Sequence, residues 1–103
     1  MKYKARANLI PDKAKAFYEV LSDGTVQKLR PDGNAIVSAM KKAKLTGPDT
    51  IEWYESCYCA SPLKHERETV YDKYLTNIET HLVEQFGDID GESFWDYLQS
   101  TAA

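Results

Sequence analysis

Glu55 and His65 are the residues of this chain whose type and setting best fit acid–base chemistry. Glu55 falls within residues 50–59, a run rich in aromatic and β-forming residues that predicts a strand. A strand carboxyl can act as a general base when an apolar interior raises its pKa, and a nearby imidazole can orient it or carry its proton. The alternative is that Glu55 pairs with a neighbouring cation and that His65 lies in solvent.

Aromatic and basic side chains near Glu55 are the candidate ligand-binding residues. Tyr54 and Tyr58 share one face of the predicted strand, where two phenols can hold an aromatic ligand or only supply packing area. Trp53 lies on the opposite face, and Arg6 belongs to a strand predicted near the N-terminus. The register of the later strand decides which of these side chains line a pocket, because a shift of one residue exchanges the two faces.

The cysteines do not form the pattern of a metal site. Cys57 and Cys59 are separated by one residue, so on a strand their Cα atoms are about 6.5–7 Å apart, at the edge of what a disulfide tolerates. The sequence offers no second pair of soft ligands to complete a zinc site, and it contains no nucleophile-elbow, phosphate-loop or dinucleotide-binding pattern. We therefore expect buried, reduced thiols, no metal and no cofactor.

Length and composition restrict the class of protein. The 103 residues, of which 43% are hydrophobic, predict a single domain over residues 1–103 with one modest core. No segment approaches the roughly 20 apolar residues of a membrane span, and the scattered basic residues with a net charge of −3 do not predict a nucleic-acid interface. The N-terminal apolar residues are interrupted by polar ones, unlike a signal peptide, so we expect a cytoplasmic protein.

Hydrophobic spacing predicts an α+β domain. Residues 2–9 alternate between polar and apolar, as a strand does, and Pro11 opens a stretch with helical spacing that ends at residues 22–24. Residues 35–45 fit the spacing of a helix and that of a strand. Because a turn of hairpin length at residues 46–49 precedes the next strand, we expect a strand that ends near Leu45.

Ser61 and Pro62 predict the start of a long amphipathic helix, with the Ser61 hydroxyl as its N-cap. Residues 83–89 then predict a final strand, and residues 94–98 a short amphipathic piece. The residues that form the one-sided face of the long helix are Leu63, Arg67, Val70, Tyr71, Tyr74, Ile78 and Leu82.

The order strand, helix, two-stranded hairpin, helix, strand is that of a ferredoxin-like split βαβ fold, an antiparallel sheet with two helices on one face. The other face of that sheet would expose large aromatic side chains in a monomer. We therefore expect a second copy of the chain to cover it and form a homodimer.

Two segments resemble the dimeric α+β barrel superfamily, and within it the antibiotic biosynthesis monooxygenase-like proteins. KARANLIPDKAKAFYEVL, residues 4–21, looks like the first strand, proline turn and helix of that superfamily. IEWYESCYCASPLKHERETVYDKY, residues 51–74, looks like its strand carrying Glu and the following helix carrying His, matched here by Glu55 and His65. The resemblance implies a dimeric barrel, and members include cofactor-independent oxygenases, haem-degrading enzymes and dehydratase-like or lyase-like proteins.

These observations predict a small homodimer whose pocket binds or converts a small, partly apolar organic molecule without a metal. If the protein is an enzyme, we expect cofactor-independent monooxygenase-like or acid–base isomerase-like or lyase-like chemistry, with Glu55 and His65 catalytic and Tyr54 and Tyr58 positioning the ligand. The competing hypothesis is an interaction or regulatory module that docks a protein partner through its aromatic surface and residues 94–97.

Overall fold

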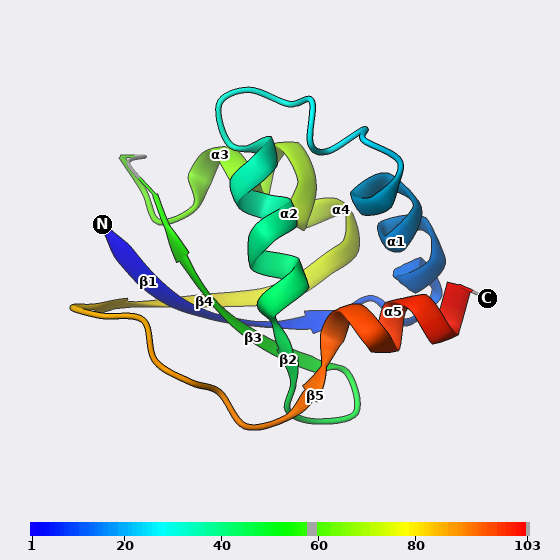
Figure 1. Ribbon diagram of the computed structural model, residues 1–103. Coiled ribbons are helices and arrows are strands. Elements are labelled where there is room, and N and C mark those ends of the chain that lie inside the picture. The colour runs from blue at the N-terminus through cyan, green and yellow to red at the C-terminus, as the bar shows by residue number, and fades with distance from the viewer. Residues whose placement is uncertain (58–59, 103) are drawn as a thin grey trace.

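The computed structural model describes residues 1–57 and 60–102 and shows an α+β fold (Figure 1). Five antiparallel strands form one sheet in the spatial order β4-β1-β3-β2-β5. The strands are β1 (Lys2–Leu9), β2 (Lys44–Leu45), β3 (Thr50–Ser56), β4 (Leu75–Val83) and β5 (Glu92–Ser93). The helices are η1 (Pro11–Lys13) running into α1 (Ala14–Ser22), α2 (Gly33–Lys42), the continuous segment α3 (Lys64–Glu66), η2 (Arg67–Tyr71) and α4 (Asp72–Tyr74), and α5 (Phe94–Ala102).

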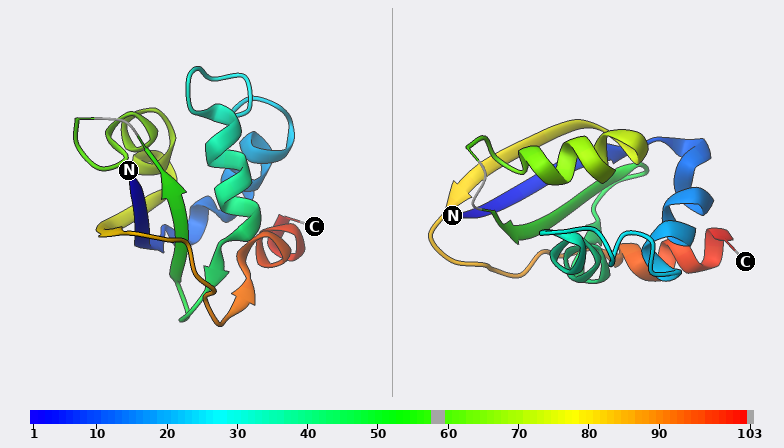
Figure 2. Two further views of the ribbon diagram at one scale, coloured as in Figure 1. Left: turned by 60° about the vertical axis from the view of Figure 1, so that its left-hand side comes forward. Right: turned by 90° about the horizontal axis from the view of Figure 1, so that it is seen from above.

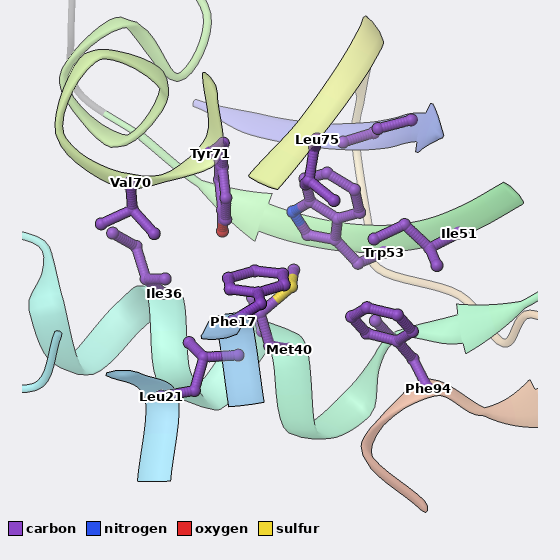
Figure 3. Close-up of a cluster of buried hydrophobic side chains, with 14 of the residues drawn as sticks. Phe17, Leu21, Ile36, Met40, Ile51, Trp53, Val70, Tyr71, Leu75 and Phe94 are labelled. Carbon is purple, nitrogen blue, oxygen red and sulfur yellow. The ribbon is translucent and has the colours of Figure 1, made fainter. Parts of the chain in front are cut away.

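Helices α1, α2 and the α3–α4 segment lie on one side of the sheet, and α5 packs beside α1 and α2 (Figures 1 and 2). Alternate residues of β1, from Tyr3 to Leu9, are buried beneath these helices, as the two-residue period of a strand requires. Large side chains from every layer meet in one core (Figure 3). The largest fully buried aromatic residues are Trp53, Tyr71, Phe17 and Phe94.

Several predicted elements are confirmed. Strand β1, the helix that follows Pro11, strand β3 and a helix beginning at Phe94 all occur where the sequence places them, and α5 continues to Ala102. Cys57 is buried, as expected, whereas Cys59 lies outside the described residues. Within residues 1–57 and 60–102, no helix has the length and hydropathy that a membrane span requires.

The strand predicted over residues 35–45 is wrong for most of its length. Helix α2 runs from Gly33 to Lys42, and only Lys44 and Leu45 extend as β2. Ile36 and Met40, four residues apart, are both fully buried against the sheet, so the helical period decides the structure. The turn at residues 46–49 still joins two antiparallel strands, but the first of them has only two residues.

The long helix predicted from Ser61 is also wrong beyond Tyr74. The chain is helical from Lys64 to Tyr74, its N-terminus has no side-chain cap, and residues 75–83 form β4 instead. The free edge of β1 offers backbone partners, and β4 pairs with it from Leu75 to Val83 with one irregularity between Arg6 and Asn8. The final strand predicted at residues 83–89 is therefore displaced, and residues 84–91 form a loop.

The face of the sheet turned away from the helices is charged rather than aromatic. Lys4 pairs with Glu52 and Arg6 with Glu79, each at 3.5 Å, across neighbouring strands. Tyr54 is the large aromatic residue that β3 places there, and Phe86 of the 84–91 loop packs on it. Within the described strands the premise for covering this face with a second subunit is met only by Tyr54 and the adjoining Phe86, and the homodimer stays a prediction. Four helical segments, rather than two, accompany the sheet in the described part of the chain.

Gly33 is required where α2 begins. A Cβ at this position would lie 2.2 Å from the carbonyl oxygen of Val26 and 2.8 Å from that of Gln27. We expect Gly33→Ala to lower the free energy of unfolding by about 1–3 kcal/mol, because backbone must move to relieve the overlap. Gly47→Ala is the control, since its Cβ would meet only the Thr50 side chain, at 3.3 Å. Equal urea midpoints for the two variants would contradict this account.

Candidate active site

One oxygen of the buried Glu55 carboxyl accepts two hydrogen bonds. The Tyr71 hydroxyl donates to Oε1 at 2.5 Å, and the Trp53 indole Nε1–H donates to the same atom at 3.0 Å. The two rings pack with centroids 5.2 Å apart, and Figure 3 shows the indole nitrogen on the side that faces Tyr71. A carboxyl that is only 3% exposed thus links β3 to the helical segment above it.

Burial raises the pKa of Glu55 to about 8. A hydrogen bond with the neighbouring Glu66 carboxyl, and the charge of that group, act in the same direction, while the donors Tyr71 and Trp53 oppose the shift. Burial and the charge of Glu55 also raise the pKa of the Tyr71 hydroxyl. Glu55 therefore holds its proton at neutral pH, and it can exchange that proton near physiological pH.

The backbone of the 64–74 segment sets the position of Glu66. Leu63 begins the segment in the left-handed conformation with φ of 54°, and residues 67–71 form a π-helical turn. Because hydrogen bonds of a π-helical turn join residues five apart, Glu66 and Tyr71, five apart in sequence, come to the same inward side. Both side chains are fully buried, and both act on Glu55.

A second group of polar side chains lies on the far side of Glu66. His65 Nδ1 and Asp32 Oδ2 are 2.6 Å apart, with both side chains partly exposed. Asp32 comes from the turn before α2, so this pair ties that turn to α3. The Cys57 thiol donates to Glu66 Oε1 at 3.7 Å. Glu55 and Glu66 are therefore buried neighbours, and the partly exposed pair of His65 and Asp32 lies next to Glu66.

Asp32, His65 and Glu66 are of types that bind metals, and one ligand atom of each lies within 4.8 Å of the others. Two ligands that bind one cation at about 2.0–2.2 Å are separated from each other by about 3 Å or more. The 2.6 Å distance between His65 Nδ1 and Asp32 Oδ2 is instead that of a charge-assisted hydrogen bond. We therefore interpret His65 and Asp32 as a hydrogen-bonded pair beside the buried Glu66, and not as part of a metal centre.

An open groove with a volume of about 910 Å³ runs along one edge of β3. Small side chains of α2 form one wall, and the 84–91 loop forms the other. Three lysines gather where α2 passes into β2. The residues that line it are Ala35, Ser38, Ala39, Lys41, Lys42, Lys44, Trp53, Tyr54, Glu55, Ser56, Phe86, Gly87, Asp88, Ile89 and Asp90.

The predicted site residues Glu55, Trp53 and Tyr54 all belong to the groove lining. The side chains of Glu55 and Trp53 are buried, whereas Tyr54 packs beside Phe86. Trp53 acts as a hydrogen-bond donor to Glu55 rather than as a surface for a ligand. Tyr54 lies with its ring centroid 5.5 Å from that of Phe86.

The other predicted residues lie elsewhere. His65 pairs with Asp32, outside the groove lining, and no hydrogen bond joins it to Glu55 in the described part of the chain. Arg6 is on the charged outer face with Glu79. Tyr58 lies outside the described residues.

Glu66 and Tyr71 are the site residues that the sequence analysis missed. Tyr71 was placed on the apolar face of the helix, but its hydroxyl was not given a partner. Glu66 lies one turn before the buried Val70, and a charged residue at that spacing on an inward face is the signal that could have found it.

No protein-family model, no curated protein and no solved structure matches this chain. The resemblance to dimeric α+β barrels therefore stays a prediction.

The raised pKa of Glu55 predicts a pH dependence of stability. Folding favours the protonated carboxyl, so this contribution is complete below pH about 4.5 and is lost as the pH rises through about 8. Glu55→Gln keeps a neutral side chain of the same shape. We expect the stability of the native protein relative to this variant to fall by up to about 1.4 kcal/mol per pH unit between those values. Urea unfolding from pH 5 to 9 measures the difference, and parallel curves would contradict it.

Tyr71→Phe should raise the pKa of Glu55 further, because the variant loses a hydrogen bond that favours the carboxylate. It should also lower the free energy of unfolding by about 1–2 kcal/mol. Titration of the ¹³C-labelled glutamate carboxyls by NMR measures the first effect. Tyr74→Phe is the control, since Tyr74 stacks on Phe17 but makes no side-chain hydrogen bond in the described structure. An unchanged Glu55 titration in Tyr71→Phe would show that this hydrogen bond does not act on the carboxyl.

Proposed function

We propose that this protein binds a small, partly apolar organic anion in the β3 groove and transfers protons to and from it through Glu55. The observation that carries the proposal is a buried carboxyl with a pKa of about 8 on the strand that lines an open groove. A general acid or base acts best when its pKa lies near the working pH. Acid–base isomerase-like chemistry is thus the predicted reaction class that this site supports best.

The groove walls support the choice of ligand. Lys42 and Lys44 favour a carboxylate or another anion where α2 passes into β2, whereas Lys41 Nζ lies over the Trp95 ring and Asp88 and Asp90 line the loop wall. Tyr54 and Phe86 offer aromatic faces that suit the apolar part of the ligand. In the proposed reaction Glu55, once ionised, removes a proton from carbon next to a carbonyl and returns it to the resulting enolate, so no electron or group is exchanged with another molecule.

The ferredoxin-like arrangement belongs to the same proposal. The order β4-β1-β3-β2 and the antiparallel pairing of each neighbour support it, with α2 and β5 as additions. In this proposal His65 does not contact Glu55; it lies beside Glu66, and Glu66 in turn acts on the Glu55 carboxyl.

Phenylpyruvate is a suitable probe, because it combines a carboxylate, a phenyl ring and an exchangeable proton beside a ketone. We expect it to shift the backbone NMR signals of the groove residues, and the protein to accelerate deuterium uptake at that carbon in D₂O with a midpoint near the pKa of Glu55. Glu55→Gln should still bind the probe but lose the acceleration.

Glu52→Gln provides the matched control, since Glu52 is on the same strand but faces outward and pairs with Lys4. If the probe leaves the groove signals unchanged, the proposed binding site is wrong. If the two variants accelerate exchange equally, Glu55 is not the proton-transferring group.

A further inference from the structure

The edge of β3 that faces the groove is open along half of its length. Strand β2 pairs only with Ile51 and Glu52, so residues 53–56 have no neighbouring strand on that side in the described structure. On the other side, the backbones of Met1 and Cys57 exchange two hydrogen bonds, of 3.0 and 2.8 Å. This pair fixes the alternation of the antiparallel ladder.

Because bonding alternates along a strand, Glu55 and Trp53 direct their backbone groups toward β1, as Cys57 does. The N–H and C=O groups of Tyr54 and Ser56 therefore point into the groove. Neither residue has a backbone hydrogen-bond partner on that side among the described residues. The groove thus presents two donors and two acceptors at strand spacing, and Lys44 pairs with Glu52, two residues before Tyr54 on the same strand.

We propose that the groove also binds a peptide with a free C-terminal carboxylate, which adds as a strand antiparallel to β3. This inference rests on the proposed function only in placing the ligand in the same groove. The open stretch of four residues corresponds to about 13 Å of extended chain at about 3.3 Å per residue. A segment of four or five residues therefore fills it.

Charge fixes the direction of the added strand. An antiparallel strand continues the line of β2 and ends near Lys42 and Lys44, so its carboxylate meets the lysines. A parallel strand would bring its amino terminus to the same cations. Alternate side chains of the peptide would point toward Ala35 and Ala39 of α2 and, on the other side, toward Tyr54 and Phe86. In strand addition, such contacts with alternate side chains determine which peptide sequences bind.

The test uses the pentapeptide acetyl-Val-Thr-Val-Thr-Val with a free carboxylate, the same peptide as a carboxamide, and two forms with N-methyl groups on alternate amides. We expect the carboxylate to bind at least about tenfold more tightly than the carboxamide, and this ratio to approach one in the triple variant Lys41→Gln, Lys42→Gln, Lys44→Gln. One N-methyl series should lose binding by about tenfold and the other should retain it.

Amide hydrogen exchange supplies an internal control. Bound peptide should protect the N–H groups of Tyr54 and Ser56 and leave those of Trp53 and Glu55, which bond to β1, unchanged. Equal effects of the two N-methyl series, or no binding of the carboxylate peptide, would overturn the inference. If phenylpyruvate perturbs the groove while the peptides do not, only the peptide inference fails. Protection of Tyr54 and Ser56 without peptide, together with a dimer in sedimentation, would show that a second copy occupies the edge and would also overturn it.

Discussion

Glu55 joins the sheet to the helical segment of residues 64–74, because Trp53 from its own strand and Tyr71 from that segment donate to the same carboxyl oxygen. An ionised carboxylate would lose most of its hydration in this position. The protein meets that cost by keeping the group protonated, with Glu66 beside it. Because Tyr71 and Trp53 donate to the same oxygen of Glu55, their rings pack against each other and the segment of residues 64–74 is held against the sheet.

The sequence predicted well the elements whose pattern depends on local chemistry. The alternation in β1 and the proline at the start of the first helical stretch are properties of a few adjacent residues, and both elements occur as expected. The prediction is wrong for most of residues 35–45, whose pattern fits two periods, and for residues 75–83, where Ile78 and Leu82 continue the spacing of the preceding helix. Residues 33–42 form a helix because this buries Ile36 and Met40, and residues 75–83 form a strand because they pair with the free edge of β1. Such choices depend on parts of the chain that are distant in sequence.

The candidate site was predicted only in part for the same reason. A glutamate on a strand of aromatic residues is compatible with a raised pKa in an apolar interior or with a cation as partner, and the burial of Glu55 agrees with the first. Its partners could not be read from spacing, because Tyr71 reaches it across two layers and Asp32 approaches His65 from a turn 33 residues earlier. The register of β3, which the sequence left open, placed Trp53 inside and Tyr54 outside.

The π-helical turn at residues 67–71 places one residue more between Glu66 and Tyr71 than an α-helix needs to keep two side chains on one face. Loss of one residue from this turn would restore ordinary α-helical winding and leave the two residues four apart, about one turn from each other. A chain that keeps both glutamates and the tyrosine but is one residue shorter here would accordingly still direct both side chains to the same side. A gap of one residue in an alignment at this point is therefore no sign that the paired acids are lost.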